Sequence, residues 1–142
     1  MHETLITLQG YVGGDVKRRL AGDSQVATFR VGCTPRRYSK KEGGWVDTDT
    51  QWYSVNCWRT LGEHVERSLR RGDPVIVHGR LSVHTWTNGA GQEVTTFAVD
   101  AVHVGHDLNR GTSAFTKAPR PAAAPAPAQP PTPAEQEGTV AA

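Results

Sequence analysis

The sequence of 142 residues lacks any run of about 18 apolar residues, so it contains no candidate for a membrane-spanning helix. Its first residues, Met1-His2-Glu3-Thr4, have neither the basic start nor the apolar core of a secretory signal. We therefore expect a cytoplasmic protein without a membrane partner. A large excess of one charge is also missing, because 16 Lys and Arg residues stand against 14 Asp and Glu residues. Net charge alone thus indicates no polyanionic partner.

Cysteine is scarce as well. The two cysteines, Cys33 and Cys57, are too few for a disulfide scaffold, and their spacing matches no zinc-binding pattern. In a reducing compartment we interpret both as buried free thiols. A redox-dependent bridge, within one chain or between chains, is the alternative.

Patterns that carry catalysis are absent from the sequence. His103 and His106 are three residues apart, and His78 and His84 fall on one face of a predicted strand, but neither pair has a third ligand nearby. No nucleophile motif and no glycine-rich phosphate loop of the GK[ST] type occurs. We therefore expect no metal, no cofactor and no enzymatic activity.

The composition changes near Lys117. From residue 118 to residue 142, Ala and Pro dominate, with seven prolines and no aromatic residue. Such a segment buries too little apolar surface to offset its ordering entropy, so we predict a disordered Ala/Pro-rich tail over 118–142. The rest is sufficient for one small domain, which we place at 1–105, with an extension over 106–117.

Five segments rich in β-branched and aromatic residues predict strands, at residues 4–12, 25–34, 51–60, 74–86 and 92–104. Gly13-Gly14 and Gly22-Asp23 lie between the first two segments. Asn88-Gly89-Ala90-Gly91 predicts a hairpin turn between the last two.

One helix is predicted between the third and fourth strands. Thr60-Leu61-Gly62-Glu63 matches a capping box, Leu61, Val65 and Leu69 form an apolar stripe, and Gly72 is placed to end the helix in a left-handed conformation. Three strands, a helix and two strands is the order of an OB-fold barrel. We therefore predict an all-β, five-stranded OB-fold with one short helix.

Alternation along the predicted strands sorts their side chains into two faces. The face that we assign to the core carries Ala27, Phe29, Val31, Cys33, Val55, Cys57, Val75, Val77, Leu81 and Val83. The other face carries Thr28, Arg30, Trp52, Ser54, Asn56, Trp58, His78, Arg80, Ser82, His84 and Trp86. Exposed tryptophans beside cations are typical of proteins that stack on unpaired bases. A subunit interface or the mouth of the barrel is the alternative explanation for these rings.

A long segment, residues 35–50, separates the second and third strands. It interleaves four cations with two aromatic rings: Arg36, Arg37, Tyr38, Lys40, Lys41 and Trp45. Beside the tryptophan-bearing strands, this pattern predicts a mobile flap that wraps a nucleic acid. A solvated hairpin tip is the alternative.

Four ordered blocks carry a resemblance: residues 5–10 (LITLQG), 51–55 (QWYSV), 69–72 (LRRG) and 75–86 (VIVHGRLSVHTW). Together they resemble the bacterial single-stranded DNA-binding protein family over about residues 3–105. Residues 105–113 (GHDLNRGTS) are similar to the shorter, second paralogue of actinobacteria.

The resemblance implies particular roles. Tyr38, Trp52, Trp58 and Trp86 fall on positions where the family has base-stacking aromatic rings, and Tyr53 falls on a subunit-interface position. The family forms homotetramers through its first strands, which implies an interface at Leu5, Ile6 and Leu8. By the same resemblance, residues 106–117 hook a neighbouring subunit through Phe115, and a frayed terminus is the alternative.

These observations predict a protein that binds and protects single-stranded DNA in replication, recombination or repair, near the nucleoid. The predicted phosphate contacts are Arg30, Arg36, Arg37, Lys40, Lys41, Arg80 and His84. The printed sequence ends without the acidic, phenylalanine-terminated tip by which the family recruits enzymes, so we expect a specialised paralogue that does not recruit them. An OB-fold adaptor for other proteins and an RNA-binding module are the alternatives.

Overall fold

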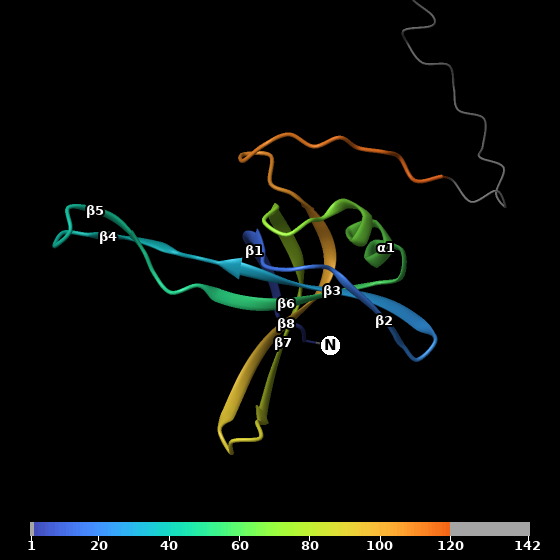
Figure 1. Ribbon diagram of the computed structural model, residues 1–142, viewed down its shortest axis with the longest axis horizontal. Helices are drawn as coiled ribbons and strands as arrows, with labels where there is room; N and C mark the ends of the chain where they lie inside the picture. The colour runs from blue at the N-terminus through green and yellow to red at the C-terminus, as the bar shows by residue number, and fades with distance from the viewer. Residues whose placement is uncertain (1, 120–142) are drawn as a thin grey trace, which may run out of the picture.

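The computed structural model describes residues 2–119 of the chain. Its elements, in chain order, are β1 (Leu5–Val12), β2 (Lys17–Ala21), β3 (Ser24–Cys33), β4 (Arg36–Ser39), β5 (Gly44–Asp47), β6 (Gln51–Trp58), α1 (Arg59–Ser68), β7 (Pro74–Thr87) and β8 (Glu93–His106). Three hairpins, formed by β2–β3, β4–β5 and β7–β8, project from a central barrel (Figure 1). None of the described helical residues forms a segment long and apolar enough to cross a bilayer.

The barrel is a ring of five strands in the order β1-β7-β8-β6-β3. A short antiparallel pairing between β1 and β3, Tyr11 with Gly32 and Val12 with Val31, closes the ring. β6 and β8 pair in parallel, and the other pairs are antiparallel. In chain order α1 lies between β6 and β7, the third and fourth of these five strands. This architecture confirms the predicted OB-fold.

Valine side chains dominate the core, because β-branched residues pack well on a pleated surface. The core cluster comprises Leu8, Val12, Ala27, Phe29, Val31, Val55, Cys57, Val65, Leu69, Val75, Val77 and Val99. The predicted core residues on β3 and β6 are therefore confirmed, apart from Cys33, which is half-buried at the end of β3. Leu61 packs against the cluster from α1.

The outer half of β7 departs from the prediction. Leu81 is only half-buried and Val83 is 53% exposed, so Val83 is not a core residue. A register irregularity lies between His78 and Gly79, where a Cβ on Gly79 would come within 2.2 Å of the Asp100 carbonyl oxygen. Beyond this point β7 and β8 continue as a hairpin that extends past the barrel (Figure 1). Side chains still alternate between the two faces of that hairpin. The face that carries Val83 no longer covers the barrel core, so Val83 is exposed.

The start of α1 also differs from the prediction. The helix begins at Arg59 with Trp58 as its N-cap residue, and no side chain caps it, so Thr60 and Glu63 form no capping box. β6 runs straight into the helix through Arg59, whose φ of 55° makes the sharp turn. The helix ends at Ser68, and Gly72 has the expected left-handed φ, of 89°, in the turn that follows.

The predicted flap over residues 35–50 is a two-stranded hairpin rather than an irregular loop. β4 and β5 pair from Arg36–Asp47 to Ser39–Gly44. After β8, residues 107–119 form no helix or strand, but Asp107 N–H donates to the Pro74 carbonyl at 3.0 Å and His106 Nδ1 lies 2.8 Å from Ser113 Oγ. The predicted disordered tail lies, from residue 120 onward, outside the described residues.

Candidate nucleic-acid interface

The outer surface of the sheet is continuous across β3, β6, β8 and β7, because directly opposed residues point to the same face. Arg30 opposes Ser54 and Gly32 opposes Trp52 between β3 and β6. Asn56 lies beside Asp100 of β8, which in turn opposes Arg80 of β7. His84 opposes Thr96, and Trp86 opposes Val94, farther along the same face. The register therefore brings Trp52, Trp58, Trp86, Arg30, Arg80 and His84 to one surface.

Trp52 has a fixed place on this face. Its ring lies against two glycines, since a Cβ on Gly13 or Gly32 would come within 2.4 or 3.0 Å of ring atom Cζ3. The Arg30 guanidinium lies over the ring, 4.5 Å from the centroid, which is a cation–π arrangement. The ring nevertheless remains 43% exposed. A cation and a flat apolar surface are thus available side by side.

Trp58 and Trp86 are exposed to a similar degree, and hydrogen bonds orient both rings. Trp58 Nε1–H donates to Asp100 Oδ1 at 3.4 Å, and Trp86 Nε1–H donates to Thr96 Oγ1 at 3.1 Å. Each bond uses the polar edge of the indole and leaves part of the ring exposed. Fixed, partly exposed rings provide stacking surfaces with little side-chain entropy left to lose.

The β4–β5 hairpin carries the remaining aromatic residues of the predicted site. Tyr38 and Trp45 oppose each other and pack edge to face, with ring centroids 6.0 Å apart. Both rings are exposed, at 59% and 69%. Lys40 and Lys41 lie in the turn of this hairpin. The hairpin therefore presents rings and cations together, well away from the barrel (Figure 1).

The predicted phosphate contacts differ in their ion pairing. Arg36 binds Asp47 at 2.9 Å and Arg80 binds Glu3 at 3.2 Å. Within residues 2–119, Arg30, Arg37, Lys40 and Lys41 have no ion-pair partner. His84 is exposed on the outer half of β7. The unpaired cations follow β3 into the β4–β5 hairpin, so positive charge is most available at that end of the face.

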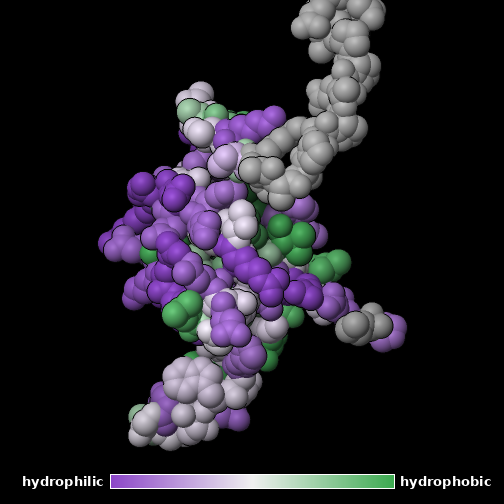
Figure 2. Space-filling model, turned by 90° about the vertical axis from the view of Figure 1, so that its right-hand side faces the viewer, coloured by the Kyte–Doolittle hydropathy of each residue, from purple (hydrophilic) through white to green (hydrophobic). Residues whose placement is uncertain are grey.

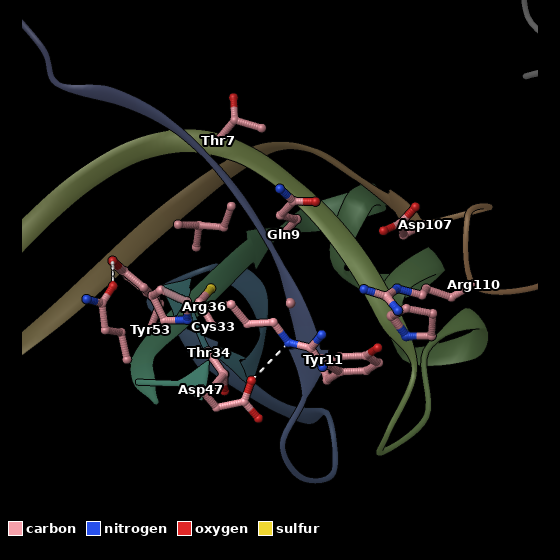
Figure 3. Close-up of a pocket in the computed structure, with 16 residues that line it drawn as sticks. Thr7, Gln9, Tyr11, Cys33, Thr34, Arg36, Asp47, Tyr53, Asp107 and Arg110 are labelled. Atoms are coloured by element: carbon pink, nitrogen blue, oxygen red, sulfur yellow. Dashed lines mark hydrogen bonds and ion pairs between the residues drawn. The ribbon is translucent and has the colours of Figure 1, made fainter. Parts of the chain in front are cut away.

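A separate hollow of about 710 Å³ lies beside β1. Figure 3 shows Cys33 and Tyr53 in it, with the Arg36–Asp47 ion pair at its rim. β1 pairs with β7 over its length but with β3 only at Tyr11 and Val12, so among the described strands none occupies the other edge of residues 5–10. Strand edges of this kind accept a further strand.

The residues predicted for a subunit interface lie at or near this edge. Leu5 is 57% exposed, Ile6 is half-buried, and Leu8 packs into the core of its own barrel. The ring centroids of Tyr53 and Phe97 are 5.9 Å apart, and Phe97 is 42% exposed. An apolar region thus continues from β1 to the base of the β7–β8 hairpin.

Comparison with known proteins decides the family. Residues 4–107 match the model of the single-strand binding protein family. The chain belongs to this family. It is 42% identical over 118 residues to single-stranded DNA-binding protein 2 of Streptomyces avermitilis, a match that covers 82% of this chain and 73% of the relative. It is 35% identical over 113 residues to single-stranded DNA-binding protein 2 of Tropheryma whipplei (strain Twist), covering 79% and 74%.

Solved structures of family members have the same fold. The crystal structure of the small single-stranded DNA-binding protein from Streptomyces coelicolor matches with a TM-score of 0.69 and 36% identity, covering 78% of this chain and all of that one. The second single-stranded DNA-binding protein of Mycobacterium smegmatis matches with a TM-score of 0.61 and 31% identity, covering 82% and 100%. These four relatives are actinobacterial second or small paralogues, as the sequence resemblance predicts, although single-stranded DNA-binding protein 1 of Streptomyces coelicolor is also 38% identical over 120 residues.

The two cysteines of this family member lie far apart. Cys33 opposes Gln51, whereas Cys57 opposes Ala27, six residues farther along the same strand pair. At about 3.3 Å per residue their separation is about 20 Å, far beyond the roughly 7 Å limit for a disulfide. A bridge within one chain is therefore excluded, and both thiols are free. Burial raises the pKa of Cys33 and raises the pKa of Cys57 to about 12.

Sequence reasoning missed one part of the family member's charged surface. The segment between the first two predicted strands contains β2, whose residues 17–19 are Lys17, Arg18 and Arg19. All three are exposed. β2 is short and carries cations on both faces, so it lacks the apolar alternation that identifies a half-buried strand.

Proposed function

We propose that this chain binds single-stranded DNA without sequence preference, by stacking bases on its aromatic rings and contacting phosphates with its cations. The observation that carries the proposal is the shared outer face of Trp52, Trp58 and Trp86, with Arg30 over the first ring. A duplex hides the faces of its bases, so only an unpaired strand matches such a surface. Every base has a flat face, and the surface therefore tolerates any sequence.

Stacking provides most of the contact area and the cations provide attraction over distance. Each base–ring stack contributes about 1–3 kcal/mol. Arg30, Arg37, Lys40 and Lys41 are the cations most available to phosphates, because Arg36 and Arg80 already pair with carboxylates. Tyr38 and Trp45 would add rings where the strand reaches the β4–β5 hairpin.

The active form in this proposal is a homotetramer. The open edge of residues 5–10 supports pairing of β1 with β1 of a second copy, which would build a sheet across both barrels. Leu5, Ile6 and Tyr53 would be covered next to that edge, while Leu8 would contribute through its backbone because its side chain is in the core. Phe115, 91% exposed in the extension, would contact a neighbouring subunit. Several linked sites would raise the avidity for long DNA.

Such a protein protects single strands wherever a duplex is opened. Replication, recombination and repair all expose them, and in a bacterium they occur in the cytoplasm around the nucleoid. The proposed role is stoichiometric binding rather than catalysis, because stacking and phosphate contact change no covalent bond.

Tryptophan fluorescence during titration with oligo-dT, at low and high salt, tests the proposal. We expect strong, saturable quenching and weaker affinity at high salt, because bases stack on the rings and binding releases counterions. Absence of quenching at both salts would overturn the proposal and favour an adaptor whose rings contact protein. Tighter binding of a matched RNA oligonucleotide than of DNA would instead indicate an RNA-binding module.

A further inference from the structure

The strand β2 extends the outer face of the sheet on the side opposite the β4–β5 hairpin (Figure 1). We propose that Lys17 and Arg19 bind phosphates and lead the DNA strand past Trp58 onto the β2–β3 hairpin. The inference rests on the proposed function and adds a second positively charged end to the binding face. It concerns residues that no sequence pattern singled out.

The register between β2 and β3 orients the two cations. Arg19 opposes Val26, which on its other side opposes Trp58. Arg19 and Trp58 therefore lie two strands apart on one face, about 10 Å between backbones. Val26 between them is completely buried although it is on the outer face, which shows that its neighbours fold over it.

Lys17 occupies the next row of the same face. It opposes Thr28, whose Oγ1–H donates to Asn56 Oδ1 at 2.9 Å. Asn56 lies beside Asp100, so a carboxylate is present at the far end of this row. Asp100 of β8 lies on one side of Trp58 and the cations of β2 lie on the other. The cations would therefore attract the phosphates to the side of Trp58 that is away from the carboxylate.

Arg18, between these two cations in the sequence, points the other way. It opposes Ala27, which is in the core and is covered by α1 at Gly62. Accordingly, Arg18 binds Glu66 of α1 at 3.0 Å and also contacts the side chain of Gln25. Its charge is used within the fold, and its position supports the assignment of Lys17 and Arg19 to the outer face.

Lys17 and Arg19 remain available for a ligand. Both are exposed, and neither has an ion-pair partner within the described part of the chain. Figure 2 views the molecule from the side toward which the β2–β3 hairpin projects. Strongly hydrophilic side chains gather over the middle of this face of the molecule. Arg19 in the row of Trp58 and Lys17 in the next row thus give a single strand that leaves the ring two accessible cations for its phosphates.

Protection of an exposed strand edge is the competing role for these cations. Among the described strands β2 pairs only with β3, and lysines or arginines on such an edge prevent pairing with other chains. That role predicts aggregation when the charges are removed, with no change in how DNA affinity responds to salt. The two roles therefore differ in a measurable quantity.

The test compares the double variant Lys17→Gln/Arg19→Gln with the matched control Arg18→Gln. Dissociation constants for oligo-dT are measured from 50 to 200 mM salt, with thermal melting and light scattering as checks on folding and aggregation. If two phosphate contacts are lost, the negative slope of log affinity against log salt becomes less steep by about 1.4, and affinity drops about sixty-fold at 50 mM and about ten-fold at 200 mM. Arg18→Gln leaves the slope at the wild-type value.

The results separate this inference from the proposed function. If wild-type protein binds and quenches while the double variant keeps the wild-type slope, β2 is not part of the DNA path and only this inference fails. If Arg18→Gln makes the slope less steep by about 0.7, half the change in the double variant, this also overturns the inference, because loss of net charge would then explain the effect. If wild-type protein gives no quenching with oligo-dT, the proposed function itself fails.

Discussion

Trp52→Ala tests the stacking mechanism at the ring whose surroundings are best defined. The substitution removes a ring that is 43% exposed and leaves Arg30 without the surface on which it lies. The loss of one base–ring stack corresponds to about 1–3 kcal/mol of binding free energy. The dissociation constant should therefore rise by about 5- to 150-fold, and equally for oligomers of dT, dC and dA.

Anisotropy of a labelled oligonucleotide is the appropriate assay, because the substitution itself removes part of the tryptophan fluorescence. The salt dependence of affinity should stay at the wild-type value, since no charge is lost. Trp52→Tyr keeps a flat ring and should recover most of the affinity. Gly13→Ala offers a second approach, because its new Cβ would lie 2.4 Å from the Trp52 ring and displace it without removing any side chain.

Two results would refute this reasoning. A loss confined to one base would show that Trp52 reads the edge of that base rather than stacking on its face. Unchanged affinity in a variant that melts like the wild type would show that the ring only covers Gly13 and Gly32.

Three further predictions concern stability, charge and the end of the chain. Gly79→Ala should lower the free energy of unfolding in urea by about 1–3 kcal/mol, because its Cβ meets the Asp100 carbonyl oxygen, whereas Gly89→Ala meets nothing within 4 Å and should be nearly neutral. Burial raises the pKa of the Cys57 thiol from 9.0 to about 12. The stability contributed by the neutral buried thiol is therefore complete below pH 9 and is lost as the pH rises toward 12. Unfolding experiments should show a difference of about 1.4 kcal/mol per pH unit between wild type and Cys57→Ala across this window; parallel curves would contradict it. Removal of residues 118–142 should leave the affinity for oligo-dT nearly unchanged, and a large change would assign these residues a part in binding.

The barrel could be predicted from the sequence because its strands carry a strong and simple signal. Alternation placed Phe29 and Val55 in the core and Trp52 on the outer face, as the structure has them. The same rule failed at Val83, because alternation identifies a face but not where the barrel ends. The predicted capping box at Thr60 was wrong for a related reason. The left-handed φ of Arg59 joins β6 directly to α1, and nothing in the residue types signals that junction.

The binding face shows a similar division between local and long-range information. Tryptophans separated by up to 34 positions in the sequence, from Trp52 to Trp86, share a surface only through the registers of β6, β8 and β7. Their residue type and their alternating positions along the strands were sufficient to predict them as exposed stacking residues. The availability of a cation, by contrast, depends on the partner that the fold brings to it.

Arginines illustrate why charge counts in sequence overstate a phosphate site. Arg36 and Arg80 belong to the predicted phosphate contacts, yet each already binds a carboxylate, Asp47 or Glu3. The Glu3 partner lies 77 positions away from Arg80, so only the folded chain reveals this pairing. Exposed ion pairs of this kind contribute little to stability and are weakened by salt, so phosphates compete with the carboxylates for both arginines. If DNA binds at these two positions it replaces an existing partner, so we expect a smaller net contribution to affinity from Arg36 and Arg80 than from Arg30, Lys40 or Lys41.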